Sequence, residues 1–116
     1  MADLTDLEIT KLCAEAMGLH ITDEAQNGHA VWVAATDVPA HEAEYVYDPL
    51  RKDAQAMALV KKFKLEPRFA GKIGTSWHGQ WLVTQHNARE PLANHSDLNR
   101  AICECVAKMQ REKANG

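Results

Sequence analysis

The dipeptide Asn27-Gly28 constrains the fold of this chain more than any other feature, because both residues tolerate the positive φ of a two-residue type I′ turn. Such a turn joins antiparallel strands, and strands over about 20–26 and 29–35 fit around it. Counting outward from the turn places five residues on one face of the ribbon, namely Ile21, Ala25, Ala30, Trp32 and Ala34. The two valines of the second strand lie on the other face, so we expect a sheet that is covered on both sides.

A second hairpin is predicted around His78-Gly79, with Trp77 opposite Gln80. The segment Tyr45–Tyr47 adds a short strand between the two hairpins. Long stretches with helical spacing of apolar residues separate these strands, so the chain is expected to contain both kinds of element.

The first helix is marked at both ends. Thr5 lies three residues before Glu8, which is the spacing of a capping box. Apolar residues then recur at helical spacing from Ile9 to Met17, and Gly18 is suited to the left-handed conformation that ends a helix.

Two further helices are predicted after the strands. Asp48 is expected as the N-cap of the second, with Pro49 in its first turn, where a missing N–H costs nothing. Ser96 or Asp97 is expected to cap the third, whose apolar stripe runs from Leu98 to Met109.

The order of these elements predicts an α+β fold for residues 1–116, taken as one domain. We expect a mainly antiparallel sheet of about four to five strands with three helices, arranged as a helix-sheet-helix sandwich. No internal repeat is visible in the sequence.

The last predicted helix carries two cysteines one residue apart, Cys103 and Cys105. Residues two apart on a helix point about 200° away from each other, so the two thiols cannot hold one metal ion together. Cys105 lies on the apolar stripe, and we expect it to be buried together with Cys13. Cys103 lies off the edge of the stripe and is expected to be more accessible.

Catalytic and metal-binding patterns are missing from the sequence. The six histidines form no pair four apart on a helix, no C-x-x-C occurs, and no G-x-S-x-G surrounds either serine. The glycines of 70–76 occur in the wrong order for a phosphate-binding loop. We therefore expect no catalytic residue, no cofactor and no metal. A metal-dependent hydrolase stays as an alternative that needs histidines and glutamates to converge in space.

The charge and hydropathy of the chain limit the classes of partner and the cellular location that we expect. The net charge of −3 argues against nucleic acid, whose phosphates require a basic surface. A small nucleic-acid-associated factor stays as an alternative if the basic residues of 61–64 and 68–72 form one patch. No apolar run approaches the roughly 20 residues of a membrane span, and the acidic N-terminus lacks the layout of a signal peptide, so we expect a cytoplasmic protein.

Three segments, TDLEITKLCAEAMG, YDPLRKDAQAMALVKKF and DLNRAICECVAKMQ, resemble small uncharacterised proteins of tailed phages and prophages. That group is similar to the phage ABA-sandwich domain. The matching positions are Tyr47, Pro49, Asp53, Ala54, Ala56, Trp81, Ala101, Ile102 and Cys103. The resemblance implies helices on both sides of a sheet and a phage or prophage origin. It carries no catalytic residues.

Together these observations predict a non-enzymatic phage or prophage accessory protein that binds a protein in the bacterial host cytoplasm. Inhibition of a host process or defence system is the form of binding that we expect, and a homo-oligomer is left open. The predicted partner-binding residues are Trp77, His78 and Arg89, at the second hairpin tip and in a nearby loop. Tryptophan and arginine are the residue types that most often anchor protein interfaces.

Overall fold

The computed structural model describes residues 4–35, 44–70, 79–86, 88 and 91–115. In chain order the described elements are α1 (Asp6–Ala16), β1 (Leu19–Glu24), β2 (Val31–Ala35), β3 (Tyr45–Tyr47), α3 (Asp53–Phe63), β4 (Glu66–Ala70), β5 (Gln80–Thr84), β6 (Ala93–His95) and α4 (Leu98–Asn115). The predicted α+β class with antiparallel strands is confirmed.

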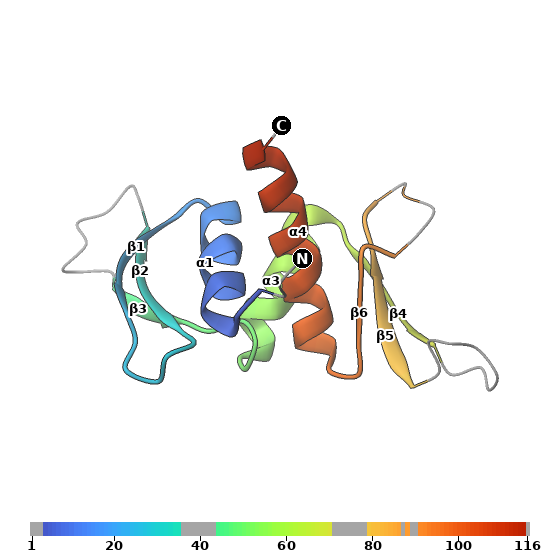
Figure 1. Cartoon of the computed structure of the whole chain (residues 1–116), viewed down its shortest axis with the longest axis horizontal. Helices are drawn as coiled ribbons and strands as arrows, with labels where there is room; N and C mark the ends of the chain where they lie inside the picture. The colour runs from blue at the N-terminus through green and yellow to red at the C-terminus, as the bar shows by residue number, and fades with distance from the viewer. Residues whose placement is uncertain (1–3, 36–43, 71–78, 87, 89–90, 116) are drawn as a thin grey trace.

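The described residues form six strands instead of the four to five expected, and these make two separate sheets instead of one. Sheet A has the order β1-β2-β3, and sheet B has the order β4-β5-β6. Figure 1 shows sheet A on the left, sheet B on the right and the helices between them. In the described part of the chain the layers are therefore sheet, helices, sheet, which reverses the predicted helix-sheet-helix order.

The central helix α4 explains this layer order. It buries residues 101–103 and 105–107, so its apolar surface extends around most of its circumference and needs cover on several sides. It packs against α1 and α3 and against β5 and β6 of sheet B. Helix α1 in turn packs against α4 and against β1 and β2 of sheet A, so the core runs through the whole helix layer.

The first hairpin forms where the sequence predicts it, but its turn is not of type I′. Gly28 has a φ of 81°, whereas Asn27 does not take a positive φ. The Asn27 Oδ1 instead accepts hydrogen bonds from the backbone N–H groups of His29 and Ala30, each at 3.0 Å. This side-chain support stabilises the turn without the left-handed backbone expected at Asn27.

A bulge changes which residues of sheet A face the core. The register shifts between Ile21 and Asp23, so Ile21 pairs with Val33 and shares its face. Val31 and Val33 are fully buried in the core, and Trp32 lies on the opposite, outer face. The prediction that Ile21 shares a face with Trp32 is therefore wrong.

The predicted N-terminal caps are right for two of the three predicted helices. Thr5 and Glu8 form both hydrogen bonds of the capping box at the start of α1, and Gly18, with a φ of 76°, follows its end. Asp97 caps α4, because its Oδ2 accepts the N–H of Arg100 at 2.9 Å. Of the two candidates named for this cap, the structure selects Asp97.

Asp48 is not the N-cap of α3, which begins only at Asp53. Residues 48–51 form a turn, in which the Asp48 carbonyl accepts hydrogen bonds from the N–H groups of Arg51 and Lys52. The Gln55 side chain links this turn to the helix, because its Oε1 accepts from the Asp48 N–H at 2.6 Å and its Nε2 donates to the Val46 carbonyl at 3.2 Å. This link places the start of α3 four residues later than predicted.

One arrangement of elements occurs twice in the described part of the chain. An 11-residue helix followed by a three-stranded antiparallel meander occurs as α1-β1-β2-β3 and again as α3-β4-β5-β6, and α4 follows. Each 11-residue helix is followed by a left-handed residue, Gly18 in the first unit and Lys64 in the second. The repeat is one of architecture, which the sequence does not show.

Candidate functional site

The predicted partner-binding residues Trp77, His78 and Arg89 lie outside the described residues. The neighbouring Trp81 packs against the core and lies 5.2 Å from the ring centroid of Phe69, which is 51% exposed. The predicted binding surface at this end of sheet B therefore stays a prediction. The described residues form two other candidate sites, a polar pocket and a groove.

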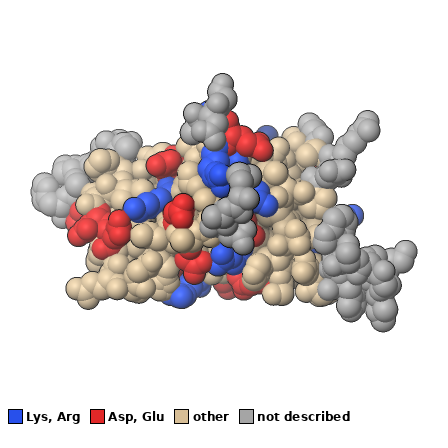
Figure 2. Space-filling view, in the orientation of Figure 1, with Lys and Arg blue, Asp and Glu red and all other residues tan. Residues whose placement is uncertain are grey.

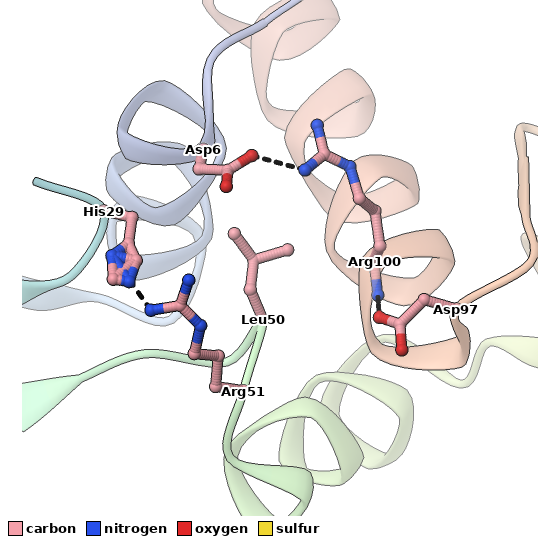
Figure 3. A pocket seen from close by; sticks show the side chains of 6 residues that line it. All are labelled: Asp6, His29, Leu50, Arg51, Asp97 and Arg100. Atoms are coloured by element: carbon pink, nitrogen blue, oxygen red, sulfur yellow. Dashed lines mark hydrogen bonds and ion pairs between the residues drawn. The ribbon is translucent and has the colours of Figure 1, made fainter.

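The first place is a polar pocket where four segments meet. Its cavity volume is about 140 Å³, and it lies among the first turn of α1, the β1–β2 hairpin, the 48–51 turn and the start of α4 (Figure 3). The lining residues are Asp6, His29, Leu50, Arg51, Asp97 and Arg100.

Arg100 joins α1 to α4 in this pocket. Its guanidinium forms an ion pair with Asp6 and a second one with Glu104 at 3.2 Å. Burial opposes the charge of Arg100, but the hydrogen bonds to Asp6 and Glu104 outweigh that effect and raise the pKa of the guanidinium. The ion pair with Asp6 links α1 to α4, whereas the pair with Glu104 lies within α4 and orients the guanidinium.

The other arginine, Arg51, contacts an imidazole. Its Nη1 lies 3.1 Å from Nδ1 of His29. Because a guanidinium can only donate, we assign His29 Nδ1 as the acceptor and place the ring proton on Nε2. The Nε2 atom is buried and has no hydrogen-bond partner among the described residues.

The polar groups of this pocket mainly contact one another. No serine, threonine, cysteine or lysine is among the described residues that line it. Asp6 is paired with Arg100, the Asp97 carboxylate caps α4, and Nδ1 of His29 is occupied by Arg51. One oxygen of each carboxylate and the Nδ1 atom of His29 thus serve contacts within the fold. The geometry fits a junction that fixes the helices.

The second place, which we call the acidic groove, lies on the outer face of sheet A. Its volume is about 360 Å³, and it is lined by Thr22, Asp23, Trp32 and Glu44. Trp32 is 39% exposed, although it lies on the central strand of the sheet. Figure 2 shows acidic side chains gathered at the end of the molecule that carries sheet A.

The register of sheet A explains why these side chains meet. Asp23 and Val46 are the cross-strand partners of Trp32, and residues directly opposite each other share a face. Glu44 precedes β3 by one residue and continues the same alternation. The Thr22 hydroxyl at the bulge donates to the Trp32 carbonyl at 3.3 Å, which fixes the bulge beside the tryptophan.

The sequence did not single out this groove. The alternation around Asn27-Gly28 correctly separates Trp32 from the valines, but it gives no sign that the helices cover only the valine face.

The three cysteines are free thiols and are all buried, so the prediction that Cys103 is more accessible is wrong. The Cys13 Sγ donates a hydrogen bond to the Cys103 carbonyl at 3.4 Å, which places Cys103 at the contact between α1 and α4. A side-chain hydrogen bond between the Cys13 and Cys103 thiols and burial both raise the pKa of Cys103, and burial raises the pKa of Cys105 to about 12. Thiols in such surroundings remain protonated and unreactive at neutral pH.

The described residues contain no group of three or more His, Cys, Asp or Glu side chains that could hold a metal ion. None of the helices in this part of the chain is long and apolar enough to span a membrane.

Comparisons of the chain with family models, with curated proteins and with solved structures find no match in any of the three. The resemblance to phage ABA-sandwich proteins therefore stays an expectation drawn from the sequence motifs.

Proposed function

We propose that this chain is a non-enzymatic accessory protein of phage or prophage origin that acts by binding another protein in the bacterial cytoplasm. Inhibition of a host process or defence system is the effect that this binding would have. The proposed origin rests on the sequence motifs. The proposed mode of action rests on one observation, the exposed Trp32 on the outer face of sheet A.

The surroundings of Trp32 support a docking role. The helices contact sheet A through its valine face, so the tryptophan does not contribute to the core described above. A large aromatic side chain gains free energy when a partner removes it from water, and tryptophan is strongly enriched among the residues that dominate binding energy. The half-buried Val46 beside it extends the apolar surface across two strands.

A binding role also agrees with the polar pocket. Its charged groups are held by contacts within the fold, because Asp6 pairs with Arg100 across two helices, Arg51 contacts His29, and Asp97 caps α4. This arrangement supports a protein that offers a rigid surface over one that performs proton transfer or nucleophilic attack.

The test is affinity capture from a bacterial lysate with tagged wild-type protein, followed by mass spectrometry. A Trp32→Ala bait should lose the specific partner, whereas a Tyr45→Ala bait should keep it. Tyr45 is similarly exposed but lies on the opposite face of the sheet from Trp32. Equal capture of the same partner by all three baits would remove the support that Trp32 gives, and a Trp77→Ala bait would then test the hairpin-tip surface predicted from the sequence.

The nucleic-acid alternative rests on a different set of residues. Lys61, Lys62, Lys64 and Arg68 are all exposed around the end of α3 and the start of β4. Glu66 is exposed among them, so the basic surface is interrupted. A gel shift that weakens steeply with salt would favour this alternative, and no shift at low salt would count against it.

A further inference from the structure

We propose that the acidic groove binds the cationic end of an arginine or lysine side chain. This inference rests on the proposed function, because the cation would belong to the partner protein. It adds the chemistry of recognition, which is a guanidinium or ammonium group held between Trp32 and two carboxylates. Three observations carry it.

The first observation is uncompensated negative charge. Asp23 and Glu44 both line the groove, both are exposed, and no lysine or arginine belongs to the described lining. The neighbouring Glu24 pairs with Lys11 at 2.9 Å, so the nearby lysine is already engaged. A cation that enters the groove would therefore meet two carboxylates that have no ion-pair partner among the described residues.

The second observation is the aromatic ring. Tryptophan binds cations over its face more strongly than any other side chain, and the effect grows as water is excluded. Trp32 lies directly opposite Asp23 in the β1–β2 pairing, so the ring and the carboxylate belong to one rigid cross-strand pair. The combination of an aromatic surface with acidic side chains favours a cation over a neutral or anionic group.

The third observation is size. A volume of about 360 Å³ exceeds what a bare ammonium or guanidinium group fills, so the methylene groups of the side chain can also enter. Lysine and arginine combine an apolar stem with a charged head. The stem would pack on Trp32 while the head reaches Asp23 and Glu44.

The probe for this inference is N-acetyl-arginine amide, added to ¹⁵N-labelled protein and followed by NMR. The indole N–H of Trp32 is assigned from the signal that disappears in a Trp32→Phe variant. We expect saturable shifts at this indole with a millimolar Kd. N-acetyl-citrulline amide has nearly the same shape without the charge and should cause no saturable shift. Equal responses to the two probes, or no response to either, would overturn the inference.

The variants separate charge from packing. Asp23→Asn combined with Glu44→Gln should weaken arginine-amide binding by about tenfold. The matched control, Glu15→Gln combined with Glu112→Gln, removes the same charge from exposed positions on two helices and should leave the Kd unchanged. Thermal unfolding of both variants checks that they fold. Equal weakening by the two pairs would show a general charge effect and would contradict a specific groove.

The failures of the two proposals can be told apart. If the groove binds the arginine probe but the lysate yields no partner, the cation site stands and the proposed function fails. If a partner is captured equally well by wild type and by the Asp23→Asn, Glu44→Gln variant, the proposed function stands and the cation does not determine binding.

Discussion

At the residue scale, Cys13, Cys103 and Cys105 are packed inside the helix layer with no exposed surface. The apolar stripe of α4 correctly predicts burial of Cys105, because one covered face is enough to bury it. Cys103 could not be placed from the stripe, since its burial depends on α1 covering a second side of α4. Similarly, the bulge that moves Ile21 onto the valine face leaves no signal in the alternation of residues.

Burial of the thiols predicts slow chemical modification. In native buffer, a thiol reagent should label all three cysteines only as fast as the core opens, because none has an accessible sulfur. The measurement is the labelling rate followed by mass spectrometry, with urea-unfolded protein as the fast reference. Rapid native labelling of Cys103 would mean that the α1–α4 contact is wrong.

The raised pKa of Cys105 predicts a loss of stability at high pH. Its pKa is about 12 in the folded chain, against an ordinary value of 9.0. Because the folded pKa is the higher one, the stabilising contribution is complete below pH 9.0 and is lost as the pH rises toward 12. The free energy of unfolding should fall across this window by up to about 1.4 kcal/mol per pH unit from this group.

Urea unfolding at a series of pH values measures this slope, and Cys105→Ala is the comparison. The variant is expected to be less stable at every pH. Above pH 9.0, however, its free energy of unfolding should fall less steeply than that of wild type, by up to about 1.4 kcal/mol per pH unit, because it lacks the one ionising thiol. Parallel curves for the two proteins would contradict an ionisation of Cys105 that opposes folding.

At the element scale, short-range signals predict the ends of elements well, and long-range contacts decide the exceptions. Thr5 with Glu8, Gly18 and Asp97 act within a few residues of the helix end that they mark, so the sequence displays them. Asp48 also has the type of side chain that caps helices, but Gln55, seven residues later, holds its N–H and shifts the start of α3. A competing side chain at that distance is not visible in a local pattern.

The ion pair between Asp6 and Arg100 predicts a measurable coupling between α1 and α4. A double-mutant cycle with Asp6→Asn and Arg100→Met should give a coupling energy of up to about 1 kcal/mol, because both side chains are partly exposed. The cycle is measured by urea unfolding, and the coupling should shrink in high salt. A coupling of zero at low salt would show that the pair contributes nothing to the helix contact.

At the scale of the whole molecule, the α+β class follows from the order of the elements, but the layering does not. The six described strands form two sheets, and these flank the helix layer that contains the apolar surface of α4. The acidic groove is a consequence of this layering, since it lies on the face of sheet A that the helices leave open. For that reason the candidate site was not predictable from the sequence.

The fold is expected to be independent of metal. The core of the described residues consists of apolar side chains and thiols that do not converge on an ion. Treatment with a chelator should leave the Tm unchanged. A fall of more than about 5 °C would contradict this prediction, because structural zinc contributes directly to folding free energy.

Binding through the outer face of sheet A is the central claim, and the affinity of the captured partner for wild type and for Trp32→Ala tests it most directly. Isothermal titration should show a loss of at least about 30-fold in affinity for the variant, as expected when a tryptophan that anchors an interface is truncated. Its Tm should stay close to that of wild type, because Trp32 lies outside the core cluster. An unchanged affinity, or a loss of affinity that only accompanies a loss of folding, would contradict the claim.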